Sequence, residues 1–170
     1  MAGGMPIFWP LQRISANLWN SSEQLYQAAK YDCNTQCIPE SNPQADPYVR
    51  NRIRAATNPK HAKLTQKCAA YAGLIRKDWA DPEKEVRIKA MLWVLELKLY
   101  WNQATFGWLL AQTKDMPIVE VSSKDDFWGC YIRGDYLVGR NVLGKLLMQV
   151  RERSAEIKRG NFTHPDGWLL

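Results

Sequence analysis

The chain has 170 residues, of which 46% are hydrophobic and 24% are charged, and its formal net charge is +6. This balance is typical of one folded domain and argues against a disordered chain or two domains. No apolar run reaches the roughly 18 to 20 residues that cross a bilayer, and the first ten residues lack the basic start of a signal peptide, so we expect a cytoplasmic protein without a membrane anchor.

The positive charge is concentrated in one segment. Residues 48–77 hold eight basic side chains and no acidic one, so all other residues together sum to −2. Eight tryptophans are also more than a globular core requires. A basic segment combined with surplus aromatic rings indicates an anionic partner, with DNA or RNA approaching through residues 50–77 as one candidate.

The first predicted helix spans about residues 20–33, because short polar side chains at its start can cap its amides. Glu23, Tyr26, Gln27 and Lys30 fall on one face of this helix at i, i+3, i+4 and i+7. This face is either a solvent-exposed stripe, which composition alone favours, or one wall of a pocket.

Glu23 and Lys30 are the reactive pair if this face lines a pocket. Seven residues span about 10.5 Å of helix, so the two side chains cannot pair directly but could converge on a ligand between them. A neutral lysine can attack an aldehyde or the C1 carbon of a sugar, provided that burial or neighbouring cations lower its pKa. Lys30, which is close to the basic segment, is therefore a candidate nucleophile.

The middle of the chain predicts a loop and three helices. Prolines and turn formers predict the loop over 35–48, and basic helices follow at about 48–56 and 59–74. Asp81-Pro82 has the form of a helix start, a capping carboxylate followed by proline. The long apolar segment after it predicts the central packing helix.

The C-terminal half predicts a shorter helix near 104–112, a strand at 117–123 and a last helix that begins near Asn141. The alternating β-branched residues of 117–123 are the best strand signal in the chain. The tail over 160–170 is irregular. We therefore predict an α+β fold, predominantly helical, in which residues 1–170 form a single domain with a small β-sheet.

Two short segments carry polar groups suited to ligand binding. Residues 122–129 combine adjacent carboxylates with Trp128 and a glycine, which suits a loop that stacks on a planar ring and handles a proton, or else a turn with a surface tryptophan. Residues 76–79, Arg-Lys-Asp-Trp, have a similar character, although Trp79 could instead pack on the following helix.

Gly139-Arg140-Asn141 directly precedes the last predicted helix. Free amides, the helix dipole and a guanidinium at such a position form a natural phosphate site, whereas the alternative is an ordinary asparagine cap of the helix. The segment also fits the start of a nucleotide-binding P-loop. Leu146 stands where the magnesium-binding hydroxyl belongs, however, so hydrolysis of nucleoside triphosphates is disfavoured. We expect Gly144 instead to be a close-packing residue inside the last helix.

Metal and thiol chemistry are disfavoured as well. The four cysteines include no C-x-x-C pair, and Cys33 and Cys37 with His61 or Cys68 match no standard zinc spacing. We expect free, mostly buried thiols. Neither His61 nor His164 belongs to a triad pattern, and we expect no metal and no cofactor.

Four segments follow one another in a recognisable order: SSEQLYQAAKY, IRKDWADPEKEVRIKAM, DDFWG and GRNVLGKLLMQVRE. In this order and at these intervals they resemble the YbiA-like NADAR superfamily over about residues 19–153. Two departures from the family pattern stand out. Residues 1–19 lack its usual strand-like opening, and Arg140 replaces the more common lysine, which keeps the charge but favours bidentate contact with phosphate.

The resemblance implies a catalytic face that carries Glu23 and Lys30, with Asp126 as a supporting carboxylate in a polar loop. Tryptophans and small polar residues complete the implied substrate pocket. Together with their neighbours on the same segments, the candidate substrate-binding residues are Tyr26, Gln27, Arg76, Trp79, Trp128, Gly129, Gly139, Arg140 and Asn141.

Members of this family are described as N-glycosidases. Some act on a phosphoribosylamino-pyrimidine intermediate of riboflavin synthesis, and others remove ADP-ribose from guanine in nucleic acid. The resemblance therefore implies a hydrolase of the bond between a ribose and a base, with ADP-ribosylated guanine as the favoured substrate. The riboflavin intermediate is the alternative substrate, and a non-catalytic module that binds ADP-ribose or nucleic acid is the alternative function.

Overall fold

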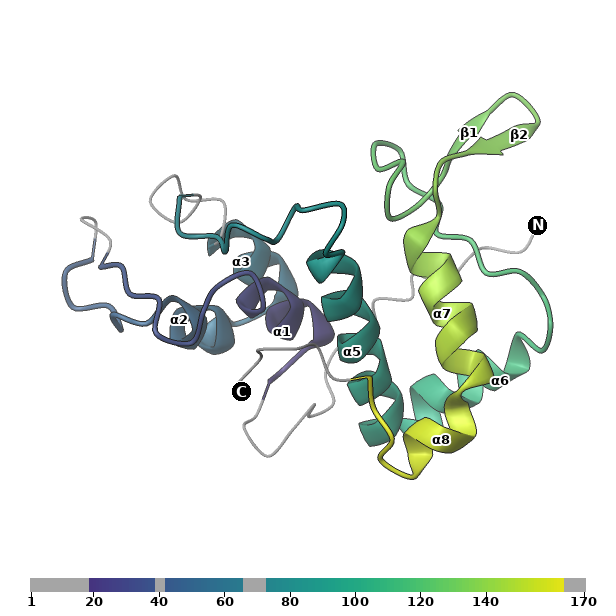
Figure 1. The fold of residues 1–170 in the computed structure, drawn as a ribbon, viewed down its shortest axis with the longest axis horizontal. Coiled ribbons are helices and arrows are strands. Elements are labelled where there is room, and N and C mark those ends of the chain that lie inside the picture. The colour runs from purple at the N-terminus through teal and green to yellow at the C-terminus, as the bar shows by residue number, and fades with distance from the viewer. Residues whose placement is uncertain (1–18, 39–41, 66–72, 164–170) are drawn as a thin grey trace.

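The fold is predominantly helical with one small hairpin, as predicted (Figure 1). The computed structural model describes residues 19–38, 42–65 and 73–163. Within these ranges the helices are α1 (Ser22–Ala28), α2 (Val49–Ala55), α3 (Pro59–Thr65), α5 (Val86–Trp101), the π-helix η1 (Gln103–Gly107), α6 (Trp108–Gln112), α7 (Val142–Glu152) and α8 (Ser154–Lys158). None of these helices combines the length and the apolar character that a bilayer crossing requires.

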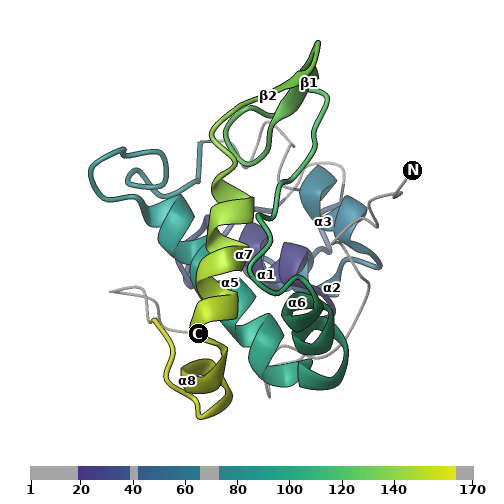
Figure 2. The same cartoon turned by 90° about the vertical axis from the view of Figure 1, so that its right-hand side faces the viewer.

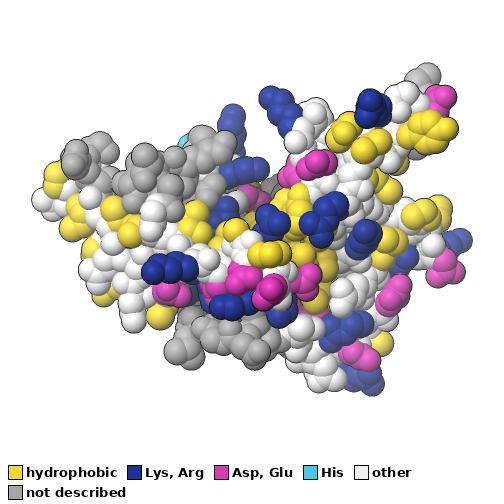
Figure 3. Space-filling view, turned by 45° about the horizontal axis from the view of Figure 1, so that its top comes forward, with side chains coloured by type: hydrophobic (Ala, Val, Ile, Leu, Met, Phe, Trp, Pro, Cys, Tyr) yellow, Lys and Arg dark blue, Asp and Glu magenta, His cyan; other side chains and the backbone are white. Residues whose placement is uncertain are grey.

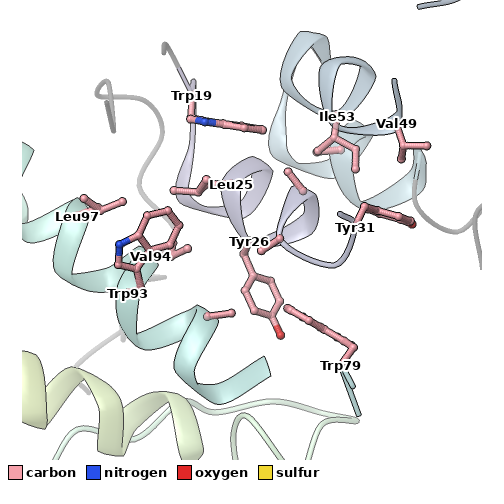
Figure 4. Packing of buried hydrophobic residues seen from close by; sticks show 14 residues of the cluster. Trp19, Leu25, Tyr26, Tyr31, Val49, Ile53, Trp79, Trp93, Val94 and Leu97 are labelled. Atoms are coloured by element: carbon pink, nitrogen blue, oxygen red, sulfur yellow. The ribbon is translucent and has the colours of Figure 1, made fainter. Parts of the chain in front are cut away.

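Helix α5 is the central helix, as the sequence predicts, and it separates two clusters of buried side chains (Figure 1, Figure 2). On one side it packs against α1, and Figure 4 shows Trp93 of α5 beside Leu25 of α1. On the other side Leu92, Leu95 and Leu99 pack into the cluster that includes α6, α7 and α8. A helix that is apolar on both sides is buried along most of its length, and this burial joins the two halves of the molecule.

The first and last helices begin where the sequence places them. Ser21 caps α1 by accepting a 3.2 Å hydrogen bond from an amide of the first turn, and α7 begins directly after Asn141. Helix α1 ends at Ala28, however, earlier than predicted, and a tight turn through Lys30 follows. Lys30 is therefore no longer placed by the regular helical rise.

The predicted start of the central helix at Asp81-Pro82 is wrong. The Asp81 carboxylate accepts hydrogen bonds from the amides two and three residues further on, but these bonds cap a turn. Glu85 then adopts a left-handed backbone conformation with φ 52°. An α-helix cannot continue through a left-handed residue, so α5 begins at Val86.

The predicted strand at 117–123 is also wrong. The segment forms one isolated parallel bridge, between Val121 and Cys130. The strands of the described residues are instead β1 (Tyr131–Arg133) and β2 (Tyr136–Val138), which pair antiparallel in a hairpin that projects from the body of the molecule (Figure 2).

The side chain of Asn141 explains why 117–123 does not pair as a strand. Its Nδ2 donates to the Ile118 carbonyl over 2.8 Å, and its Oδ1 accepts from the Glu120 amide over 3.0 Å. These are the backbone groups that a neighbouring strand would otherwise engage. Gly144 of α7 completes the junction, because a Cβ there would overlap the Ile118 carbonyl and the Asn141 amide. The predicted close-packing role of Gly144 is confirmed.

A buried carboxylate ties the end of the described chain to α5. Glu96 is fully buried and forms an ion pair with Arg153. It also accepts hydrogen bonds from the amide of Thr163 over 2.7 Å and from its hydroxyl over 2.9 Å. A buried charge is tolerated only when it is paired and hydrogen-bonded in this way. Residues 160–163 of the predicted irregular tail form neither helix nor strand. Residues 164–170 lie outside the described residues.

Candidate active site

Three aromatic side chains from distant parts of the chain form one cluster. The ring of Tyr26 in α1 lies 5.4 Å from Trp79 and 5.8 Å from Trp128, centroid to centroid. Figure 4 shows Tyr26 reaching from α1 toward Trp79. Tyr26 and Trp79 are buried and Trp128 is half-buried. The fold thus brings together three of the predicted substrate-binding residues.

Glu23 is held by Gln27, which lies one turn further along the same face of α1. The Nε2 of Gln27 donates to Glu23 Oε1 over 2.6 Å. Gln27 is only 3% exposed, and its Oε1 accepts no hydrogen bond within the described part of the chain. An unsatisfied buried acceptor costs about 1–3 kcal/mol, so the position is suited to accept a hydrogen bond from a bound ligand.

Lys30 has the lowered pKa that a nucleophilic lysine requires. Its Nζ lies 5.8 Å from the centre of the Tyr26 ring and 6.0 Å from that of Trp79. Burial lowers the pKa of Lys30 to about 8, against the opposing charge of Glu23 and with a further contribution from Lys63 of α3. A lowered pKa is the condition under which Lys30 could act as the predicted nucleophile.

The guanidinium of Arg76 is already paired. Its Nε lies 2.6 Å from Asp78 Oδ1 and its Nη2 lies 2.9 Å from Oδ2, a bidentate contact that holds the pKa of Asp78 below its usual value. The Arg76 amide donates to the Lys30 carbonyl over 2.9 Å, which fastens this turn to the end of α1. These contacts favour a role in positioning Trp79.

The backbone amides at the start of α7 are not free. Those of residues 140–143 donate to the carbonyls of residues 126–129 over 2.6–3.1 Å. The predicted phosphate site built on these amides is therefore wrong, because each donor already has an acceptor inside the fold. The side chain of Arg140 remains, and it is exposed.

Asn141, Gly129 and Gly139 shape this loop. Asn141 has a left-handed φ of 49° and uses its side chain on the 118–120 segment, so it is not the ordinary helix cap considered above. A Cβ on Gly129 would lie 2.6 Å from the Glu120 carbonyl oxygen. Gly139, with φ 149°, has no room for a Cβ beside the Gly129 carbonyl. The three residues are therefore explained by backbone packing.

The two carboxylates of the polar loop differ in their surroundings. The Asp126 side chain is exposed and has no hydrogen-bond or ion-pair partner in the described structure. Asp125 Oδ1 accepts the amides of Phe127 over 3.0 Å and Trp128 over 2.8 Å. Asp125 therefore sets the orientation of Trp128, a role that the sequence analysis does not assign.

Arg87, in the first turn of α5, is a site residue that the sequence analysis misses. Its guanidinium carbon lies 3.8 Å from the centre of the Phe127 ring. Burial and the charge of Glu23 raise the pKa of Tyr26 above its usual value, and the charge of Arg87 is close enough to oppose them. Arg87 and Phe127 are 40 positions apart in the sequence, so only their contact in the folded structure identifies Arg87 as part of the site.

Two clefts lie away from this aromatic cluster. One, of about 580 Å³, is lined by residues of the 42–61 segment. The other, of about 420 Å³, lies where the π-helix and α6 meet α7 and α8. No predicted site residue lines either cleft, so the candidate site is defined by the contacts among its side chains and not by a cleft.

The described residues contain no group of His, Cys, Asp or Glu side chains that could hold a metal ion. The described cysteines carry free thiols: Cys130 is buried, Cys37 is half-buried and Cys33 is exposed. The expectation of mostly buried thiols is therefore wrong for Cys33, and Cys68 lies outside the described residues.

Comparison with known proteins gives a consistent result. A family model described as the NADAR domain matches residues 9–154. A riboflavin biosynthesis protein of Vibrio vulnificus is 32% identical over 91% of this chain, but the match spans only 36% of that protein. An N-glycosidase of Nostoc punctiforme is 31% identical over 82% of this chain and 76% of its own length.

The N-glycosidase YbiA of Escherichia coli is 28% identical over 86% of this chain and 77% of its own length. No solved structure shows a significant match. The sequence relatives therefore come from two groups, proteins named N-glycosidases and longer proteins named for riboflavin biosynthesis.

Proposed function

Because this chain belongs to the NADAR domain family, we propose that it is a hydrolase that cleaves the N-glycosidic bond between a ribose and a nitrogen base. The observation that carries the proposal is the presence of an oriented carboxylate, Glu23, and a lysine of lowered pKa, Lys30, in one region. Both lie beside the aromatic cluster of Tyr26, Trp79 and Trp128. Aromatic side chains of this kind can stack on the base that leaves.

Glu23 is our candidate for general acid and base. Cleavage of an N-glycosidic bond develops positive charge on the ribose and requires a proton on the departing nitrogen. The hydrogen bond from Gln27 Nε2 fixes one oxygen of Glu23 and leaves the other for the substrate. We retain Asp126 as a supporting carboxylate at the exposed rim.

Lys30 has two possible roles, which differ in one covalent bond. As a nucleophile, its neutral Nζ attacks C1 of the ribose while the bond to the base breaks; the nitrogen of the base takes the proton that Nζ loses, relayed by Glu23. The ribosyl-lysine then opens to an iminium ion, which water hydrolyses to release the sugar and Lys30. As an electrostatic group, Lys30 instead binds ribose hydroxyls and phosphate in its charged form.

ADP-ribosylated guanine in nucleic acid is the substrate that we favour. A polymeric substrate requires a positive approach surface, and Lys63 of the basic segment is close enough to Lys30 to affect its pKa. The segment is not uniformly available, however, since Arg76 is paired with Asp78 and Arg50 is half-buried. We propose nucleic-acid contact through the exposed side chains of α2 and α3 in residues 50–77.

The phosphoribosylamino-pyrimidine intermediate of riboflavin synthesis is the second candidate substrate. The names of the Vibrio vulnificus and Zea mays relatives, both riboflavin biosynthesis proteins, favour it. A small phosphorylated substrate would need the aromatic cluster but not the basic segment.

The test incubates the protein with ADP-ribosylated guanine DNA and, separately, with the riboflavin intermediate. Release of a free base from one of them is expected, with at least a hundredfold loss in Glu23→Gln and Lys30→Ala. Glu152→Gln and Lys145→Ala, exposed on α7, are the matched controls and should retain full activity. If neither base is released, the hydrolase proposal for these substrates is wrong, and binding without release would identify a non-catalytic module.

Trapping with borohydride separates the two roles of Lys30. A reduced adduct of the sugar on Lys30, found by peptide mass spectrometry during turnover, supports the iminium route. Turnover without any adduct excludes that route and leaves the electrostatic role.

A further inference from the structure

Two arginines, one in the first turn of α5 and one in the loop just before α7, meet on one aromatic ring. The guanidinium carbon of Arg87 lies 3.8 Å from the centre of the Phe127 ring, and that of Arg140 lies 4.7 Å from the same centre. The two guanidinium carbons are therefore no more than about 8.5 Å apart. The ring fixes both cations in one small region at the start of α5 and α7.

Neither of these guanidinium groups is neutralised within the described residues. Neither Arg87 nor Arg140 forms an ion pair or a side-chain hydrogen bond there. Arg76, by contrast, is fully engaged with Asp78. Two like charges held within this distance repel each other, and a bound anion would relieve that repulsion.

The surrounding fold adds positive potential. Helix α5 has 16 residues and α7 has 11, and the N-terminal end of each, which carries partial positive charge, lies next to the two arginines. The first amides of α7 already serve the 126–129 loop, so the side chains must make the contacts to a ligand. Figure 3 shows Lys and Arg side chains next to hydrophobic ones near the centre of the view, with Asp and Glu side chains beside them.

The arginine pair is continuous with the candidate active site. The Phe127 ring lies 5.0 Å from Trp128, and Trp128 lies 5.8 Å from Tyr26. An anion held by the arginines would therefore sit one aromatic ring away from the cluster beside Lys30.

We propose that Arg87 and Arg140, held on Phe127, form a clamp for the diphosphate of the substrate. Each guanidinium presents a planar fork of donors that contacts two oxygens of a phosphoryl group. Two forks match the four non-bridging oxygens of a diphosphate bridge, whereas a single phosphate ester has three. The clamp therefore selects a diphosphate-linked sugar such as ADP-ribose over a monophosphate, and only the identity of that sugar rests on the proposed function.

Calorimetric titration of the full chain with ADP-ribose, ribose 5-phosphate and ribose tests the clamp. The wild type should bind ADP-ribose at least tenfold more tightly than ribose 5-phosphate, and ribose weakly. Arg87→Gln and Arg140→Gln should each weaken ADP-ribose binding tenfold or more and leave ribose binding unchanged. Lys89→Gln on α5 and Arg133→Gln in the hairpin, both exposed, are the controls and should have less than a twofold effect.

Arg87→Lys keeps the charge and the aliphatic stem but lacks the fork, so its affinity for ADP-ribose should fall between the wild type and Arg87→Gln. Thermal unfolding of each variant should be measured to check that the fold is retained. If Arg87→Gln does not fold, the affinity of Arg87→Lys for ADP-ribose tests the clamp. Wild-type affinity in Arg87→Gln or Arg87→Lys overturns the clamp, as does equal affinity of the wild type for ADP-ribose and ribose 5-phosphate.

Failure of the clamp and failure of the proposed function give different results. If base release depends on Glu23 but is unaffected in Arg87→Gln, the clamp proposal is wrong and the hydrolase proposal stands. If ADP-ribose binding depends on Arg87 but no base is released, the clamp proposal stands and the hydrolase proposal is wrong.

Discussion

As a nucleophile, Lys30 reacts only as its neutral amine, and this role predicts that the rate of base release rises about tenfold between pH 7 and pH 9. With a pKa of about 8, about one tenth of the amine is neutral at pH 7, half at pH 8 and nine tenths at pH 9. A lysine with the ordinary pKa of 10.5 would be only about 0.03% neutral at pH 7. Burial thus increases the reactive form about 300-fold at that pH.

Two measurements on the same protein check this prediction. Single-turnover release of the base, measured from pH 6 to pH 10, should rise and level off with a midpoint near pH 8. Carbon-13 methylation of the lysines, followed by NMR titration, should show one resonance with the same midpoint, and Lys30→Met should lack it.

The neighbouring charge provides a matched pair of variants. Lys63→Gln removes a cation that lowers the pKa of Lys30, so its profile should move to higher pH. Lys89→Gln, which is exposed on α5, should leave the profile unchanged. A titration midpoint near 10.5, or a rate that is flat between pH 7 and pH 9, would refute the reasoning.

Three further predictions concern the fold and the aromatic cluster. Glu96→Gln breaks an ion pair whose carboxylate is fully buried and should lower the free energy of unfolding by about 3 kcal/mol in urea denaturation; a change below 1 kcal/mol would contradict it. Gly144→Ala places a Cβ into a backbone carbonyl and should cost about 1–3 kcal/mol in thermal unfolding, while Gly73→Ala, with open space around it, should not. Trp128→Leu should raise KM about tenfold through lost stacking, whereas Trp108→Leu, at a side chain 57% exposed, should leave KM unchanged.

Local signals in the sequence predict much of the helical framework. The cap at Ser21 and the apolar length of α5 both depend on residues close together in the chain. The strand at 117–123 fails as a prediction because Asn141, some twenty residues away, binds the backbone groups that would form a ladder. The start of α5 fails because Glu85 adopts a left-handed conformation that no propensity indicates.

The candidate site is predictable to the same degree. The helical spacing of Glu23 and Gln27 already places them on one face, and the structure adds the direct hydrogen bond between them. Lys30 lies in the turn after α1, and its lowered pKa depends on tertiary burial. Arg87 could not be identified as a site residue from the sequence, because an arginine in the first turn of a helix carries no local sign of function. Its significance depends on Phe127, which only tertiary folding brings beneath it.

The hairpin β1–β2 leaves and re-enters the body of the protein at nearly one point. The Asn141 amide donates to the Gly129 carbonyl over 3.1 Å, and Gly139 packs directly against residues 129 and 130. The loop that carries Trp128 is therefore closed beneath the hairpin, independently of the hairpin's length. The exposed turn at Gly134 and Asp135 can accept an inserted peptide, a fluorophore or an affinity tag while the chemistry below it stays intact.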